Sequence, residues 1–120
     1  MKIITVGNHI AVLKELGKLL SEIFPGSEIM AETDALMAGK YAFNHEVDMV
    51  FAETDMKRMN GLQLIRFVRH EHPGVKSYLI GSEKDFSESF LTVSEDVTGL
   101  LTSPFTKDSV KSTVTHAGDK

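Results

Sequence analysis

The strongest constraint on the fold of this chain is a fivefold alternation between two kinds of segment. Short apolar runs rich in β-branched residues are each followed by a segment whose apolar residues recur at helical spacing. Such alternation is typical of βα units that close over a parallel sheet. We therefore expect a doubly wound α/β fold with a five-stranded parallel sheet. The strands are predicted at 2–7, 28–31, 48–52, 75–80 and 97–101.

The helical segments lie between and after these runs. The first has an apolar stripe formed by Val12, Leu13, Leu16, Leu19, Leu20 and Ile23. The second is expected to begin after Thr33 or Asp34, since either side chain can cap a helix. The remaining helices are predicted around Leu64–Val68, over 85–93 and over 106–114.

Composition limits the size and the partners of the molecule. With 120 residues, 42% of them hydrophobic, the chain is expected to form one domain over 1–120, with an ordered core to about residue 115 and a tail over 116–120. A net charge of −4 offers no broad basic surface, so we expect no direct nucleic-acid binding by this segment. No apolar run has the length of a signal peptide core or a membrane span, which favours a cytoplasmic location and no membrane contact.

Three short motifs fall where strands are expected to end. Residues 48–62 read D-M-V-F-A-E-T-D-M-K-R-M-N-G-L. This stretch resembles the pattern D-[LMV]-V-[FL]-[LA]-D-x-x-M-P-x-M-x-G-[LF] of response-regulator receiver domains. Residues 3–9 are similar to the I-I-x-V-D-D-x of that family, and Ser103-Pro104-Phe105 to its K-P-[FV]. The resemblance spans the chain and implies a CheY-like, flavodoxin-like (βα)5 fold and a role in two-component signalling.

Two further segments refine the resemblance. Residues 33–38 and 51–56 look most like receivers that precede LytTR-type DNA-binding domains.

The resemblance also assigns the phosphorylation site, and every position in it has changed. The acidic pair that holds Mg²⁺ falls on Gly7 and Asn8, and the phosphate-accepting Asp falls on Glu53. Asp55 is a further acid in the loop that follows.

The positions that read the phosphoryl group have changed too. The hydroxyl that contacts it falls on Gly81, with Ser82 beside it if the register differs by one residue. The phosphate-binding Lys falls on Ser103, and the aromatic switch residue falls on Leu100.

These changes remove most of what phosphoryl transfer requires. Gly7 has no side chain and Asn8 offers a neutral carbonyl, so tight Mg²⁺ binding is not expected, and Glu53, Asp55 and Asn8 are weak metal candidates. Glu53 is one methylene longer than Asp, and a misplacement on the order of 1 Å can cost roughly a hundredfold in rate. Ser103 supplies no positive charge. We expect no catalytic residue, no enzyme activity and no cofactor.

Glu53 admits two interpretations. As a longer, permanently anionic side chain it could imitate a phosphorylated Asp, but the residues that would respond are absent at Gly81, Ser103 and Leu100. The favoured interpretation is a partly solvated acid paired with Lys57 or Arg58 in the same loop, a contact worth about 0 to 1 kcal/mol.

Other candidate site residues have simpler explanations. Asn8 is favoured as the N-cap of the first helix. His70 and His72 are two residues apart, so they are expected to be solvated polar side chains and not metal ligands. Phe86 and Phe90 are expected to make core contacts.

The sequence therefore predicts a degenerate receiver that works without phosphorylation. It would bind a protein partner or a second copy of itself, with the fourth helix, fifth strand and fifth helix as the contact surface. Two alternatives remain: the receiver part of a longer DNA-binding transcription regulator, and a flavodoxin-like domain that binds a small ligand or anion beside Gly7, Asn8 and Ser103. Residual phosphate acceptance at Glu53 or Asp55 is a third.

Overall fold

Five parallel strands form the middle layer of the structure. The computed structural model describes residues 1–56, 59–86 and 96–118. The strand order is β2-β1-β3-β4-β5, and every neighbouring pair is parallel. This confirms the predicted doubly wound sheet. The strands are β1 (Lys2–Val6), β2 (Glu28–Glu32), β3 (Met49–Glu53), β4 (Lys76–Gly81) and β5 (Gly99–Thr102).

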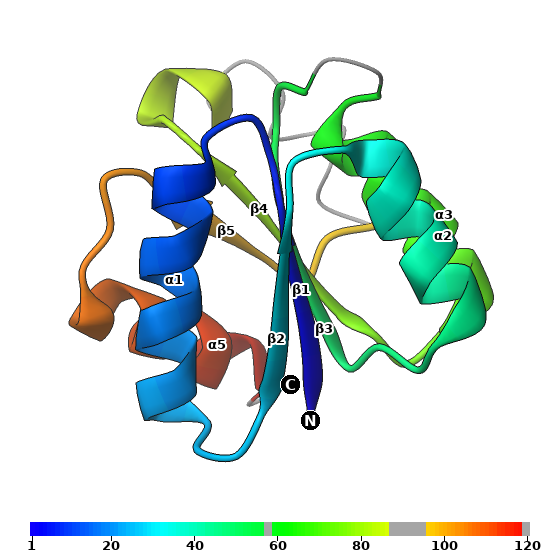
Figure 1. The fold of residues 1–120 in the computed structure, drawn as a ribbon. Helices are drawn as coiled ribbons and strands as arrows, with labels where there is room; N and C mark the ends of the chain where they lie inside the picture. Colours follow the sequence, from blue (N-terminus) through cyan, green and yellow to red (C-terminus); the bar gives the residue numbers. More distant parts are fainter. Residues whose placement is uncertain (57–58, 87–95, 119–120) are drawn as a thin grey trace.

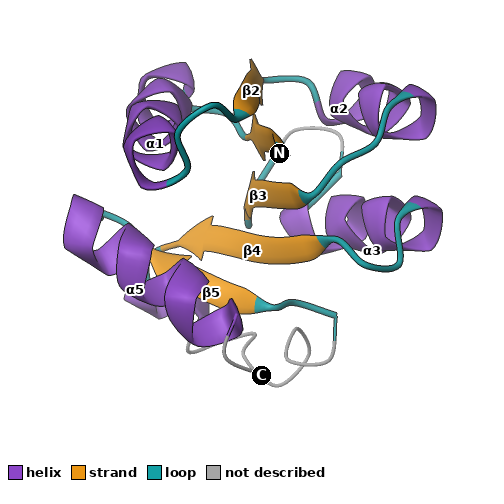
Figure 2. Ribbon diagram, turned by 90° about the horizontal axis from the view of Figure 1, so that it is seen from below, coloured by secondary structure: helices purple, strands orange, loops and turns teal. Residues whose placement is uncertain are grey.

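Helices cover both faces of the sheet (Figures 1 and 2). Helices α1 (Ile10–Ile23) and α5 (Lys107–Gly118) lie on one face, and α2 (Ala35–Asn44) and α3 (Gly61–Glu71) lie on the other. A helical turn at 83–86 follows β4. The helix predicted over 85–93 therefore falls for the most part outside the described residues, and so does Phe90.

The core consists of two apolar clusters separated by β3. Every residue of β3 is buried, as expected for a central strand covered on both faces. Val50 packs in the cluster below α2 and α3, whereas Phe51 packs below α1 and α5 and stacks on Tyr78 with ring centroids 4.7 Å apart. Because side chains alternate along a strand, residues 49, 51 and 53 share the α1 face.

The helix ends show which polar residues act as caps. Asp34 caps α2 by accepting a hydrogen bond from the Leu36 N–H at 2.9 Å, which selects one of the two predicted caps. Asn60 and Gln63 form a reciprocal capping box at the start of α3, with bonds of 2.8 and 3.0 Å. This box was not predicted from the sequence.

The last helix is longer than predicted. It extends to Gly118, beyond the end predicted at residue 114. Neither glycine nor proline occurs between Lys107 and Ala117, so the sequence contains no strong helix breaker before Gly118.

Gly61 sets how closely α3 approaches the end of β3. Its N–H donates to the Thr54 carbonyl at 3.1 Å. A Cβ atom at position 61 would collide with the carbonyl oxygen of Glu53 and lie 2.7 Å from Cδ2 of Leu79. Glycine at this position therefore lets the loop after β3 lie tightly against the sheet.

Gly61→Ala is expected to lower the free energy of unfolding by about 1–3 kcal/mol, because the added methyl group meets backbone that cannot move aside. Gly74→Ala is the matched control, since a Cβ atom there meets nothing within 4 Å. Urea unfolding of both variants tests this, and equal stabilities would contradict it.

The burial of Tyr78 should make the free energy of unfolding fall at alkaline pH. The side chain is fully buried, and its hydroxyl has no hydrogen-bond partner among the described residues. Burial raises the pKa of Tyr78 to about 12. An unfolded tyrosine ionises near pKa 10, so the folded state holds this proton more tightly; the stability it contributes is present below pH 10 and is lost as pH rises toward 12.

Tyr78→Phe should remove this alkaline loss and raise the free energy of unfolding at neutral pH by about 1 kcal/mol, because it deletes an unsatisfied hydroxyl. Tyr41→Phe leaves Tyr78 in place and should retain the loss. Urea unfolding at pH 7, 10 and 11.5 distinguishes the variants, and identical pH profiles for Tyr78→Phe and the unmodified chain would refute this explanation.

Candidate functional site

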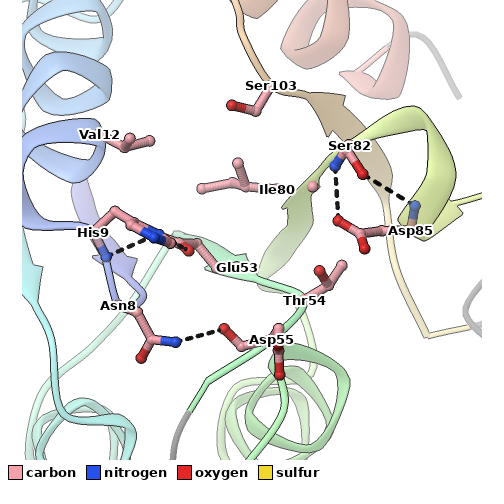
Figure 3. A pocket seen from close by; sticks show the side chains of 11 residues that line it. Asn8, His9, Val12, Glu53, Thr54, Asp55, Ile80, Ser82, Asp85 and Ser103 are labelled. Atoms are coloured by element: carbon pink, nitrogen blue, oxygen red, sulfur yellow. Dashed lines mark hydrogen bonds and ion pairs between the residues drawn. The ribbon is translucent and has the colours of Figure 1, made fainter.

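A cavity of about 330 Å³ opens at the carboxyl ends of β1, β3 and β4 (Figure 3). These strand ends lie along one edge of the sheet, where the strand order reverses around β1. The cavity is lined by Asn8, His9, Val12, Glu53, Thr54, Asp55, Ile80, Gly81, Ser82, Asp85 and Ser103.

The structure brings most of the predicted site residues together. Five of them line the cavity: Asn8, Glu53, Asp55, Gly81 and Ser103. Gly7 lies directly against the Glu53 side chain. Leu100 is different, because it is not on the lining and packs against the core cluster below α2 and α3.

Glu53 is buried and bonded to the start of α1. Glu53 is the last residue of β3, and 9% of its surface is exposed. Oε1 accepts a hydrogen bond from the His9 backbone N–H at 3.2 Å, and Oε2 lies 2.8 Å from Nδ1 of the His9 ring. The His9 side chain is 70% exposed, whereas the Glu53 side chain is 12% exposed.

The expectation of a partly solvated Glu53 is therefore wrong. The acid is buried because the alternation of β3 directs it toward α1, where His9 contacts both of its oxygens. Lys57 and Arg58, the partners predicted for it, lie outside the described residues.

Gly7 provides the space that Glu53 fills. A Cβ atom at position 7 would collide with Cγ, Cδ and Oε1 of Glu53. The absence of a side chain at 7 and the extra methylene at 53 are therefore complementary in shape.

Asn8 does not cap α1, which corrects the favoured interpretation. The N-cap is His9, one residue later, and its side chain makes no capping bond. Nδ2 of Asn8 instead donates to the backbone carbonyl of Asp55 at 3.0 Å. The amide thus links the loop after β1 to the loop after β3.

The loop after β4 is organised by Ser82 and Asp85. The Ser82 N–H donates to Oδ2 of Asp85 at 2.9 Å, and the Asp85 N–H donates to Oγ of Ser82 at 3.2 Å. A Cβ atom at Gly81 would lie 3.0 Å from Oδ2 of Asp85 and 3.2 Å from Phe86. The position predicted for a hydroxyl is therefore tightly surrounded, and the neighbouring serine is used in the turn.

The charge of the lining is negative. It contains the carboxylates of Glu53, Asp55 and Asp85, and no lysine or arginine lines it within residues 1–56, 59–86 and 96–118. Ser103 is half-buried at the position predicted for the phosphate-binding Lys, and its N–H donates to the Gly81 carbonyl at 2.7 Å. Within the described residues no group of three His, Cys, Asp or Glu is placed to hold a metal ion.

Sequence reasoning missed His9, Thr54 and Asp85 as components of the site. His9 and Thr54 directly follow predicted site positions, and Ser82 was considered only as a register alternative. Including two residues beyond each strand end would have found His9 and Thr54, because those residues still face the same cavity.

The other histidine and phenylalanine predictions are partly confirmed. His70 is exposed as expected, but His72 is half-buried and its Nε2 lies 2.6 Å from the Ala42 carbonyl oxygen. His72 therefore joins α3 to α2, and the solvated assignment is wrong for it. Phe86 is 8% exposed and packs in the core, as predicted.

In the part of the chain that the structure describes, no helix has the length and apolar character to cross a membrane.

Hydrogen bonds from Ser82 lower the pKa of Asp85, the backbone N–H contributing more than the hydroxyl. A lowered pKa in the folded state contributes stability that is fully present above the ordinary aspartate pKa, and this stability is lost as pH falls from that value through the lowered pKa of the folded state. Ser82→Ala should return the Asp85 pKa part of the way upward, since the backbone bond remains. Carboxyl ¹³C NMR titration measures this, with Ser103→Ala as the control; an unchanged Asp85 titration in Ser82→Ala would show that the hydroxyl has no influence.

Sequence comparison links the chain to regulatory proteins. No protein-family model matches the chain. It is 25% identical over 117 residues to the glycerol metabolism activator of Pseudomonas putida, a match that covers 97% of this chain and 51% of that protein. It is 29% identical over 70 residues to stress response regulator protein 1 of Lodderomyces elongisporus, covering 58% of this chain and 19% of that protein. The chain thus spans about half or less of the length of these relatives.

Solved structures identify the fold. The chemotaxis response regulator CheY4 of Vibrio cholerae superposes with a TM-score of 0.83 at 19% identity, covering 97% of both chains. A CheY-like response regulator receiver domain protein from Methanospirillum hungatei superposes with a TM-score of 0.82 at 16% identity, covering 98% of this chain and 93% of that one. The predicted likeness to receivers of LytTR-type regulators is not confirmed. The chain has the fold of CheY-like response-regulator receiver domains.

Proposed function

We propose that this chain is a non-catalytic receiver domain that signals without phosphorylation, through contact with a protein partner. The observation that carries the proposal is the state of Glu53. Its carboxylate is buried, both of its oxygens contact His9, and its side chain fills the space above Gly7.

A carboxylate in this state is a poor phosphate acceptor. Acceptance requires one carboxylate oxygen to be free and in line with the incoming phosphorus atom. Here an attack would first have to break the contacts between Glu53 and His9. A carboxylate oxygen held in the wrong position lowers the rate of phosphoryl transfer directly, because proximity and orientation supply a large share of the rate enhancement.

The electrostatic environment of the cavity also disfavours phosphoryl transfer to Glu53. A phosphoryl group carries negative charge that cations or hydrogen-bond donors must stabilise in the transition state. Among the residues that the structure describes, the lining offers three carboxylates and no lysine or arginine, and Ser103 stands where a cation is expected. The same negative charge disfavours the alternative of an anion-binding pocket.

The contacts of Glu53 also bear on the idea that it imitates a phosphorylated residue. Its described hydrogen bonds go to His9, at the start of α1, and not to Ser103 or to the loop after β4. A mimic would need those groups to respond to its charge. The contacts therefore support a carboxylate held by the start of α1 over one that permanently activates the domain.

Exposed apolar side chains support a protein partner. Leu36, Met37 and Phe43 on α2 and Phe67 on α3 are exposed, and Phe43 is 66% exposed. Phe67 lies against Gly39 of α2, so these residues belong to one helical layer. The predicted surface of the fourth helix, β5 and α5 stays a prediction, because most of the fourth helix lies outside the described residues.

A second candidate is that the chain is the receiver part of a longer transcription regulator. The match to the glycerol metabolism activator covers 97% of this chain but 51% of that protein, which favours this possibility. The full-length reading frame distinguishes the two, because a DNA-binding domain would be encoded beyond residue 120.

Titration with Mg²⁺ and beryllofluoride, followed by amide NMR, tests phosphorylation independence. Neither the unmodified chain nor Glu53→Asp is expected to respond, because the described residues around the shorter acid still supply neither a cation nor a metal site. A receiver that is known to accept phosphate serves as the positive control for the reagents. Saturable shifts of Glu53, Gly81 and Ser103 in the unmodified chain would overturn the proposal.

A further inference from the structure

The direction of Glu53 follows from the register of the sheet. Val6 of β1 pairs with Ala52 of β3, so the next residues, Gly7 and Glu53, are neighbours at the strand ends. Phe51 faces the α1 and α5 layer, and Glu53, two residues on, projects to the same face. It therefore reaches the first residues of α1 (Figure 3).

Helix α1 begins without a cap of its own. The N-cap residue His9 makes no side-chain capping bond, and the first turn contains no acidic residue. The backbone N–H groups at a helix start carry partial positive charge and favour a nearby anion. Glu53 supplies that anion from another element, since its Oε1 accepts the His9 N–H.

Three contacts join the two loops at this point. Two of them link His9 to Glu53, at 3.2 and 2.8 Å, and the third links the Asn8 amide to the Asp55 carbonyl at 3.0 Å. All three connect the segment between β1 and α1 with the segment after β3. These segments are far apart in the sequence, so the contacts fix α1 relative to the central strand.

We infer that Gly7 and His9 are positioning residues for Glu53, and that the three residues form one coupled unit in which the β3 carboxylate caps α1. Gly7 supplies the volume and His9 supplies the two contacts. The inference deepens the proposed function and rests on it in one respect, namely that the unit withholds the carboxylate from a phosphoryl donor.

The unit has a consequence for any single substitution. A side chain at position 7 collides with Glu53 in the conformation in which Glu53 contacts His9, so Glu53 would have to leave that conformation. The cost of Gly7→Ala must therefore depend on the residue at position 53. Substitutions at sites that do not touch usually have additive effects on stability, so non-additivity identifies the coupling.

A double-mutant cycle measures this coupling. Gly7→Ala should lower the melting temperature by roughly 5 to 15 °C, the range expected for overpacking a core position in a domain of this size. In a Glu53→Ala background, which lacks Cγ and the carboxylate, the same substitution should lower it by less than half as much. Gly17→Ala, on α1 and in ordinary contact with Ile29, is the control and should be additive with Glu53→Ala.

The role of His9 has a separate spectroscopic readout. His9→Ala should shift the Glu53 carboxyl ¹³C resonance and lower the melting temperature, because the contact to Oε2 is lost. His9→Asn places an amide nitrogen near the position of Nδ1 and should restore most of both. A residue with a merely structural role would not move the Glu53 resonance.

The outcomes separate the unit from the proposed function. An additive cycle between positions 7 and 53, or an unchanged Glu53 resonance in His9→Ala, would overturn the unit even if the unmodified chain is inert to beryllofluoride. A beryllofluoride response of the unmodified chain combined with a non-additive cycle would contradict the proposed function and leave the unit standing.

Discussion

Burial of β3 on both faces is the constraint on which the site depends. Because Val50 and Phe51 pack into separate clusters, a slip of the strand by one residue would exchange the side chains that the two clusters receive and disrupt the packing of both. Glu53, at the end of this strand, is thereby directed toward Gly7 and the start of α1. The hydrophobic core thus decides which group the carboxylate meets, and its contact with His9 is a consequence of packing as much as of local polarity.

This arrangement accounts for a retained scaffold with an altered pocket. A buried carboxylate is costly unless hydrogen bonds satisfy it, and His9 supplies them. The rest of the lining adds negative charge and places Ser103 where a cation is expected. Signal transmission that does not use this pocket must pass through the surface, and the exposed apolar side chains of α2 and α3 show that the surface has apolar area to offer a partner.

The fold was predictable because it depends on periodicity and on five apolar runs, and the edge on which the site lies follows from parallel strands ending together. The contacts within the site were not predictable, since they join residues of different loops that are far apart in the sequence. The bond from Asn8 to Asp55 joins residues 47 positions apart, so local capping rules predicted the wrong role for Asn8. The capping box of Asn60 was readable from the sequence and was overlooked, whereas Leu100 was placed by resemblance and packs away from the cavity.

A crystal structure of the chain grown with Mg²⁺ and beryllofluoride tests the central claim most directly, because it shows what the Glu53 carboxylate binds. We expect an unmodified Glu53 with Oε2 within hydrogen-bond distance of the His9 ring and no ion beside it. Beryllofluoride bonded to Glu53, with the His9 ring displaced into solvent, would contradict the account.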